Sequence, residues 1–301
     1  MKNFYPAIAL ESGNIIHNPF AKSHDDLLDL CDEKCEDHLL VTYRPIDIEK
    51  YRLDDLDHYT LIINQNSIPD WFDESAKANV IENLRQIIEG MIIRKRKKLL
   101  LNEGAILTST ASVARAKNSK IFVMYDNSKI QNLSDNSQVI QMTDRSLINE
   151  MYGNSIVKEM LSKSRINEMY GDSKVSKMYG RSRILKMKGH SRVDYVKGHS
   201  TIEAMDSNAF TYSLRHMSFV DEMHGDSSID EMWDWAIVNS MYDNARIDFM
   251  DDDTKVHTMH GNAFVNEMYG NAIIEEMHEH AIVGQINELA KVLKKRLKEK
   301  Q

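Results

Sequence analysis

Hydrophobic and polar positions recur with a period of nine along residues 115–285. In the unit 151–159 the first position is Met, the fifth is Ser and the seventh is Val. Over nineteen ungapped units the first position holds fifteen of the chain's eighteen Met residues, and the seventh is Ile or Val except at Thr211. The fifth position is always Ser, Ala or Thr. This alternation predicts a short buried strand in every unit, with Met filling the core.

Turn residues fill the third and fourth positions of the unit, as in Asp126-Asn127 and Gly153-Asn154. Gly, Asn and Asp tolerate the left-handed backbone that a sharp corner needs. Nine residues at roughly 3.3 Å each cannot close a coil around a packed interior, so two units are expected per coil. The sequence therefore predicts a mainly β chain: a parallel two-sheet β-solenoid of about 18 residues per coil, with odd and even units in separate ladders.

The two ends of the chain do not follow this repeat. We expect residues 1–100 to form a small α+β domain, with a helix starting in residues 23–31, strands at 38–43 and 59–64, and a long helix at 73–94. The basic run 94–98 is interpreted as a solvated junction, with a nucleic-acid patch as the alternative. Residues 101–285 then form the solenoid. Residues 286–301 are expected to form an amphipathic capping helix with Ile286, Leu289, Leu293 and Leu297 on one face, and a membrane-surface helix is the alternative.

The unit Met-Tyr-Gly-Asn-Ser-Ile-Val-Lys-Glu at residues 151–159, and the similar unit at 268–276, resemble the repeats of a loosely described group of proteins. These are bacterial and bacteriophage nonapeptide-repeat β-solenoid proteins with Met-Tyr-Gly-Asn-Ser-x-Val-x-Glu units. The resemblance covers residues 115–285. It implies a phage or mobile-element origin, and no established activity comes with it.

Composition narrows the class of protein further. The chain has 301 residues, a net charge of -8, 28% charged residues and 42% apolar residues, which suits a folded two-domain protein. It has no apolar run of about 20 residues, and its first ten residues lack a signal-peptide core. We therefore expect a cytoplasmic protein, of a bacterial or infected host cell, or a virion component. Two Cys residues are too few for a disulfide framework.

No motif in the sequence carries recognisable catalytic chemistry, so we expect no enzyme activity, no cofactor and no metal. Cys31, Cys35 and His38 have the spacing of zinc ligands on a helix, but a fourth ligand is not evident. His260 and His278 fall on one ladder, one coil apart, where exposed imidazoles are expected rather than a metal site. Calcium is disfavoured because the corner positions read Asn, Lys, His or Arg as often as Asp. An enzyme hypothesis would place its site in the N-terminal domain, around Cys31, Cys35, His38, Asp70 and Trp71.

Surface charge is the remaining signal. Residues 160–200 contain ten Lys or Arg against three Asp or Glu, a net of +7, whereas residues 201–285 contain three against seventeen, a net of -14. Like charges are expected about 5 Å apart, at a cost of about 1 kcal/mol per pair in water, where Arg165 and Arg183 share one ladder and Lys174 and Arg192 the other. The acidic segment also exposes apolar side chains at the outward sixth position. The candidate partner-binding residues are Arg165, Lys174, Arg183, Arg192, Phe210, Phe219, Asp221, Asp230, Trp233, Trp235, Ile237 and Asp248.

These patterns favour a non-enzymatic β-solenoid that presents a charge-patterned surface to another protein. The alternatives are an acidic nucleic-acid mimic that inhibits a DNA-binding enzyme, and an enzyme with its site in the N-terminal domain. Binding to nucleic acid or to a membrane is not expected. The charge split further predicts an antiparallel homodimer, in which the four basic candidates of one copy lie near Glu203, Asp221, Asp230 and Asp248 of the other.

Overall fold

The structure is a computed structural model that describes residues 5–21, 23–30, 37–47 and 50–296. Contacts within the chain divide it into two compact units. The N-terminal unit comprises residues 1–93 and 103–106, and the second unit comprises residues 94–102 and 107–301. Each unit is described by itself.

The N-terminal unit is built on a four-stranded antiparallel sheet in the order β2-β1-β3-β4. The expected strands and long helix are confirmed. The helix expected to start in residues 23–31 is a single turn, and its capped start is confirmed, because Ser23 Oγ accepts from the N–H of Asp26 at 3.4 Å and Asp26 Oδ2 accepts from the N–H of Ser23 at 3.3 Å. No helix in the described ranges is both long and apolar enough to cross a membrane. The elements are β1 (Pro6–Leu10), β2 (Ile15–His17), α1 (Asp25–Leu28), β3 (His38–Pro45), η1 (Leu56–His58), β4 (Tyr59–Ile63) and α2 (Glu74–Met91).

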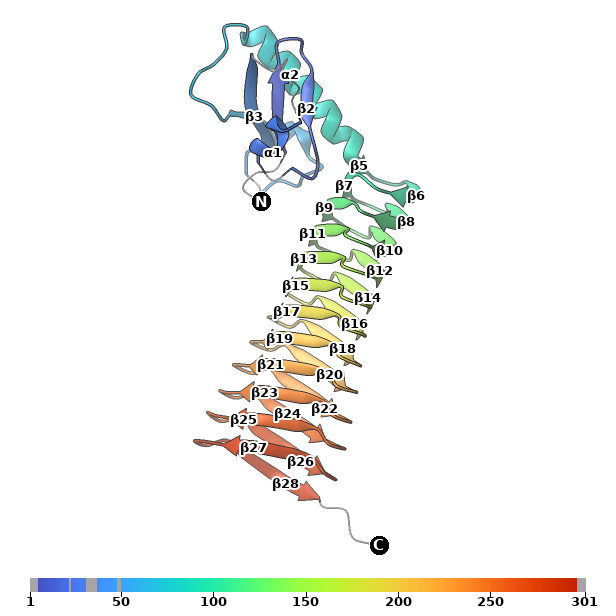
Figure 1. The fold of residues 1–301 in the computed structure, drawn as a ribbon, viewed down its shortest axis with the longest axis vertical. Coiled ribbons are helices and arrows are strands. Elements are labelled where there is room, and N and C mark those ends of the chain that lie inside the picture. The colour runs from blue at the N-terminus through green and yellow to red at the C-terminus, as the bar shows by residue number, and fades with distance from the viewer. Residues whose placement is uncertain (1–4, 22, 31–36, 48–49, 297–301) are drawn as a thin grey trace. The chain divides into compact units, whose positions relative to one another are not determined.

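Two sheets of twelve parallel strands form the solenoid, and the chain alternates between them (Figure 1). Odd-numbered strands make one sheet, here called the odd sheet, and even-numbered strands make the even sheet. The odd sheet consists of β5 (Ile92–Ile93), β7 (Gly104–Leu107), β9 (Lys120–Met124), β11 (Gln138–Met142), β13 (Ile156–Met160), β15 (Lys174–Met178), β17 (Arg192–Val196), β19 (Phe210–Leu214), β21 (Ser228–Met232), β23 (Arg246–Met250), β25 (Phe264–Met268) and β27 (Ile282–Ile286). The even sheet consists of β6 (Lys97–Leu101), β8 (Ser112–Lys117), β10 (Lys129–Ser134), β12 (Leu147–Met151), β14 (Arg165–Met169), β16 (Arg183–Met187), β18 (Thr201–Met205), β20 (Phe219–Met223), β22 (Ile237–Met241), β24 (Lys255–Met259), β26 (Ile273–His278) and β28 (Lys291–Arg296).

From β10 onward in the even sheet and from β9 onward in the odd sheet, neighbouring strands are in register at a spacing of 18 residues, which confirms the two-unit coil. Ile148, for example, pairs with Ile130 on one side and Ile166 on the other. The spacing differs at the first corner of the repeat, where Leu133 lies in register with Ala116 rather than with Arg115. This corner is one residue shorter, so the buried first position there is taken by Ala116.

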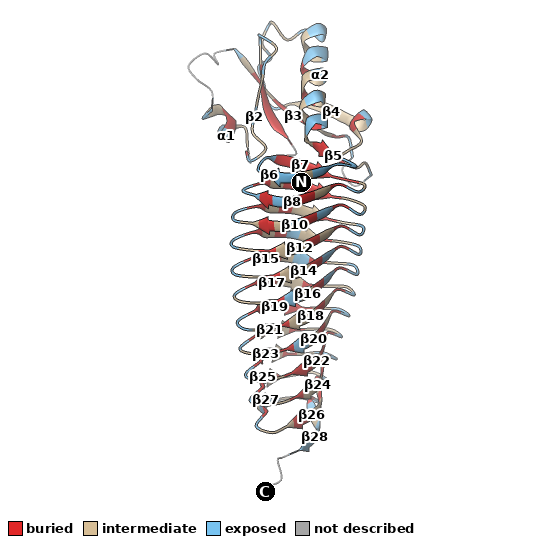
Figure 2. Cartoon of the chain, turned by 90° about the vertical axis from the view of Figure 1, so that its right-hand side faces the viewer, coloured by how far each residue is buried: buried red, intermediate tan, exposed pale blue. Residues whose placement is uncertain are grey.

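Three positions of each unit fill the core. In β12 and β14, for example, the residue at the seventh position of one unit and the residue at the first position of the next unit are buried. The eighth and ninth residues, which lie between them, face outward. The small fifth residue is also buried, and the corners are largely exposed (Figure 2). Thr211, the exception at position seven, is fully buried and its Oγ1 donates to Met205 Sδ at 3.6 Å.

Only some of the buried fifth-position serines find a hydrogen-bond partner. Ser200 Oγ donates to the backbone carbonyl of Lys197 at 2.7 Å, and Ser137 Oγ donates to that of Ala116 at 3.1 Å. Within the described part of the chain, the hydroxyls of Ser155, Ser164 and several other fifth-position serines have no partner. Close packing of a small residue, rather than a hydrogen bond, is therefore what most fifth positions require.

The expected C-terminal capping helix is wrong for residues 286–296, and Leu297 lies outside the described residues. Residues 282–286 and 291–296 form β27 and β28, which extend the two sheets by one more coil. The nonapeptide pattern continues here, because Ile286, Ala290 and Val292 take the first, fifth and seventh positions. The open edge of the preceding coil offers hydrogen bonds to any segment that can pair with it, and this favours a strand over an isolated helix. Four basic residues on β28 make the last edge a poor template for aggregation.

Candidate functional site

Each coil of the solenoid has two corners. The odd-strand corner follows an odd-numbered strand, as residues 161–164 follow β13, and the even-strand corner follows an even-numbered strand. The third residue of the unit has a left-handed backbone at both corners, for example at Asp144 (φ 56°), Ser162 (φ 57°) and Gly180 (φ 71°). At nearly every odd-strand corner the fourth residue donates its N–H to the coil before, as Arg145 does to the carbonyl of Asp126 at 2.9 Å. The N–H of the third residue does not take part in these backbone hydrogen bonds between coils.

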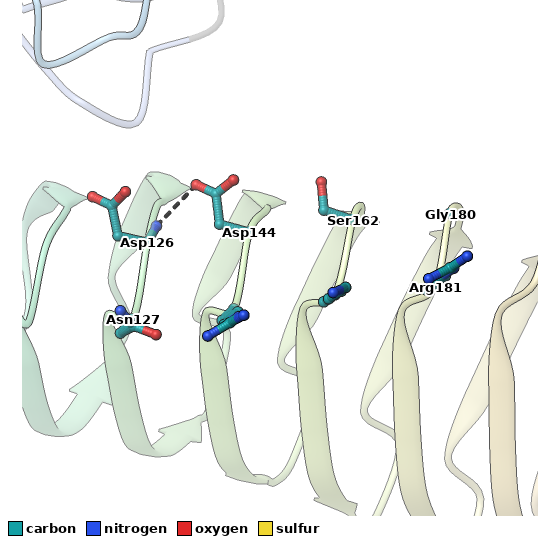
Figure 3. Close-up of a pocket in the computed structure, with 8 residues that line it drawn as sticks. Asp126, Asn127, Asp144, Ser162, Gly180 and Arg181 are labelled. Carbon is teal, nitrogen blue, oxygen red and sulfur yellow. Dashed lines mark hydrogen bonds between the residues drawn. The ribbon is translucent and has the colours of Figure 1, made fainter.

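Carboxylates of the chain bind that third-position N–H in many coils. In seven coils the third residue of the following coil is acidic, and its side chain reaches back and accepts this N–H. Asp144 Oδ2 accepts from the N–H of Asp126 at 3.0 Å (Figure 3), and Asp234 Oδ2 accepts from that of His216 at 2.9 Å. The same bond is made by Asp126, Asp243, Asp252, Glu279 and Glu288, at 2.8 to 3.0 Å.

Four consecutive coils of the odd-strand corner lack this carboxylate. The third residue of the following coil is Ser162, Gly180, Gly198 or His216 instead of Asp or Glu. As a result, the third-position N–H groups of four residues have no partner among the described residues. These residues are Asp144, Ser162, Gly180 and Gly198.

A row of cations runs beside these free N–H groups. The fourth positions of the same corners hold Arg145, Lys163 and Arg181, which line a groove of about 580 Å³ together with Asp144, Ser162 and Gly180 (Figure 3). An adjoining groove of about 880 Å³ extends onto the even sheet. The two together are here called the basic groove, and its cations are Lys129, Arg145, Lys163, Arg165, Arg181 and Arg183.

The basic groove carries more positive than negative charge, because its six cations are accompanied by only two carboxylates, those of Asp126 and Asp144. Arg183 forms an ion pair with Glu203 at 3.0 Å. The other five cations, Lys129, Arg145, Lys163, Arg165 and Arg181, form no ion pair with any residue that the structure describes. Like charges roughly 5 Å apart repel one another by about 1 kcal/mol even in water, so an anion in the groove relieves this repulsion.

The even-strand corner shows that free N–H groups alone do not make a cationic site. Gly153, Gly171 and Gly189 also have N–H groups without a partner in the described coils. The fourth residues beside them are Asn154, Asp172 and His190 rather than Arg or Lys. Over these coils, free N–H groups and a row of cations coincide at the odd-strand corner only.

The candidate partner-binding residues lie on three different surfaces. The two sheets face each other, so their outer faces point in opposite directions. Trp233 and Trp235 lie on the odd-strand corner between β21 and β22. Arg165, Arg183, Phe219, Asp221 and Ile237 lie on the even sheet, whereas Lys174, Arg192, Phe210, Asp230 and Asp248 lie on the odd sheet. One flat interface can therefore use only one of these sets.

The expected stacking of like charges is confirmed in register, and carboxylates of the same chain neutralise three of the four side chains. Arg165 pairs with Arg183 across the even sheet, and Lys174 with Arg192 across the odd sheet. Asp194 accepts ion pairs from both Lys174, at 2.6 Å, and Arg192, at 2.7 Å. Arg192 also lies over the ring of Phe210, 4.9 Å from its centroid. Of the four basic candidates, Arg165 alone lacks an ion pair in the described structure.

The acidic segment uses many of its side chains within the chain. Asp221 Oδ1 accepts from Asn239 Nδ2 at 2.9 Å, and Asp248 forms an ion pair with Arg246. Burial, together with the charge of Asp248, raises the pKa of Asp230. The Trp233 indole N–H donates to Glu231 at 3.0 Å, whereas the Trp235 side chain is 56% exposed.

The other chemical candidates lie partly outside the described residues. Cys31 and Cys35 lie outside the described residues, His38 begins β3, and Asp70 and Trp71 lie in the turn before α2. His260 and His278 stack at 4.5 Å between ring centroids, as the ladder assignment predicted. Burial, then the charge of His278, lowers the pKa of His260. No group of three or more His, Cys, Asp or Glu side chains suited to a metal occurs in the described ranges.

The sequence pattern predicted Arg165 and Arg183 as partner-binding residues, but it did not predict Arg145, Lys163 and Arg181. The signal that identifies these three is a period of eighteen, because they occupy the fourth position of every second unit. No protein-family model, curated protein or solved structure is significantly similar to this chain, so the basic groove is defined by its own geometry and charge alone.

Proposed function

We propose that this chain is a non-enzymatic β-solenoid that binds another protein through its charge-patterned surface, with the basic groove as the main contact. The observation that carries the proposal is that five cations without an ion pair in the described chain lie together in one groove, namely Lys129, Arg145, Lys163, Arg165 and Arg181. Elsewhere on the rod, cations such as Lys174 and Arg192 are neutralised by neighbouring carboxylates. A rigid row of unneutralised cations favours an acidic partner.

The repeat supports the proposal in a second way. A ladder of buried Met, Ile and Val side chains fixes the spacing of the outward residues from coil to coil. Cations held at fixed spacing lose little conformational freedom on binding, which lowers the cost of association. The resemblance of the unit to phage repeats leads us to place such a rod in a bacterial or infected cell, as a phage or mobile-element accessory or virion protein.

Binding of a fluorescently labelled ten-residue polyglutamate peptide to the full-length protein tests this proposal. We expect binding that weakens as salt rises, because screening reduces the attraction between exposed charges. The double variant Arg165→Gln/Arg181→Gln should weaken binding at least tenfold. Lys174→Gln is the matched control, since Lys174 lies on the opposite sheet and is neutralised by Asp194. No measurable binding at low salt, or equal loss in variant and control, would contradict the proposal.

Two alternatives have weaker support. A nucleic-acid mimic needs carboxylates that are free to replace phosphates, whereas Asp234, Asp243 and Asp252 are bonded to backbone N–H groups. The antiparallel homodimer would have to use one sheet only, and on the even sheet Arg183 is already paired with Glu203 of its own chain. Light scattering at low and high salt tests the dimer directly. We rank both below binding of an acidic protein.

A further inference from the structure

We propose that the basic groove recognises side-chain carboxylates of an acidic peptide through the free backbone N–H groups of Asp144, Ser162, Gly180 and Gly198. This inference rests on the proposed function and identifies the chemical group that the groove binds. Each incoming carboxylate takes the place that an acidic third residue of the next coil fills elsewhere in the chain.

The chain itself shows how such a bond is made. Seven of its own carboxylates accept this N–H, including Asp144 and Asp252 at 3.0 Å and Glu279 at 2.8 Å. Both Asp and Glu side chains make the bond, so the third-position N–H can donate to carboxylates on side chains of two different lengths. A hydrogen bond from an N–H to an ionised carboxylate is stronger than one between neutral groups. The free N–H groups therefore present a carboxylate site that is already formed.

Adjacent cations select the negative charge. At each of three coils the free N–H is followed in the chain by Arg145, Lys163 or Arg181. At the even-strand corner the equivalent neighbours are uncharged or acidic, as at Asn154 and Asp172. An anion on the odd-strand corner thus gains both a backbone donor and a cation from the same coil, which is the combination that anion sites use.

The length of the row fits a short peptide segment. Four coils at about 4.8 Å span roughly 14 Å, which about five extended residues cover. The row stops at one end because the carboxylate of Asp144 already occupies the N–H of Asp126. It stops at the other because Asp234 occupies the N–H of His216. The groove therefore takes a run of a few Asp or Glu residues.

Neutral substitutions that block the N–H groups test the inference without changing the charge of the groove. In Ser162→Asn/Gly180→Asn each Asn tolerates the left-handed backbone, and its amide oxygen can accept the preceding N–H as Asp does. We expect about tenfold weaker binding of the ten-residue polyglutamate peptide. The control is Gly153→Asn/Gly171→Asn at the even-strand corner, where a Cβ meets backbone atoms no closer than 3.4 Å, compared with 3.1 Å from the backbone N of Ser162 at Gly180. A melting curve of each variant therefore accompanies the binding measurement. The control should change affinity less than twofold.

The outcomes separate this inference from the proposed function. If polyglutamate binds and responds to Arg165→Gln/Arg181→Gln but not to the neutral caps, the proposed function stands and carboxylate recognition by the N–H row is wrong. If a ten-residue oligothymidylate binds more tightly than polyglutamate at equal ionic strength, the ligand is a phosphate polymer and the inference is also overturned. Absence of any polyglutamate binding overturns the proposed function itself.

A second measurement on the unaltered protein guards against misfolding of the variants. Amide hydrogen exchange followed by NMR reports on the N–H groups of Ser162 and Gly180 directly. Saturation with polyglutamate should slow their exchange at least tenfold, with no change at Gly153 and Gly171. Equal exchange rates with and without the peptide at Ser162 and Gly180 would overturn the inference.

Discussion

Replacement of Ile148 by Ala tests which side of the strand faces the core. Ile148 occupies the seventh position of its unit, is fully buried, and pairs with Ile130 and Ile166 in the coils on either side. The substitution removes three carbon atoms, each worth about 0.8 kcal/mol of transfer free energy. A cavity term adds to this, because hydrogen-bonded coils above and below limit collapse. We expect a loss of about 3 to 4 kcal/mol in the free energy of unfolding.

Leu147→Ala is the matched control, because Leu147 is the adjacent residue and points outward on the same strand. This substitution should cost less than about 1 kcal/mol. Urea denaturation followed by far-UV circular dichroism gives both values, read as shifts of the transition midpoint at constant slope. Ile148→Asp would be more severe, since it buries an unpaired carboxylate and should cause unfolding or aggregation. A loss at Leu147 as large as that at Ile148 would refute the inward assignment of the seventh position.

Four further outcomes follow from the corners and the core. Ser164→Ala should leave stability unchanged or raise it slightly, because the buried hydroxyl of Ser164 has no partner in the described chain. Ser200→Ala should lower the free energy of unfolding by about 1 kcal/mol, because it removes the hydrogen bond to the carbonyl of Lys197. Thermal melting compares the two variants. Asp234→Ala should lose about 1 to 2 kcal/mol, since the N–H of His216 loses its acceptor and Ala is strained at φ 62°, and Asp234→Gly should lose less. EDTA should leave the melting temperature unchanged, because corner carboxylates such as Asp252 bond to backbone N–H groups, and a fall of many degrees would restore the metal alternatives. The lowered pKa of His260 means that protonation favours the unfolded chain, so stability should fall as pH drops below the ordinary value of 6.5, and His260→Gln should flatten this dependence between pH 7.5 and 5.5.

Parts of the candidate site could be predicted from the sequence, and parts could not. The outward position of Arg165 and Arg183 on one ladder follows from the repeat, and the structure confirms it. The relief of repulsion between Lys174 and Arg192 by Asp194 does not follow, because it depends on the reach of three side chains in two neighbouring coils. The absence of a hydrogen-bond partner for the N–H of Ser162 could not be predicted either, because it depends on Gly180, the residue 18 positions later in the chain.

The nonapeptide pattern by itself determined the coil of 18 residues, the two parallel sheets and the inward Met and Ile or Val positions. These features are repeated nearly twenty times, and each depends on local alternation of small, apolar and polar residues. Only the tertiary structure decided that residues 291–296 form a strand rather than a helix. The helical spacing of Leu289 and Leu293 favours a helix, whereas the open edge of the sheet favours pairing as a strand. It also decided which corners keep a free N–H beside a cation. The physical reason is the same in both cases: the hydrogen-bond partner lies one coil away, so only the stacking of coils shows whether a backbone group is paired.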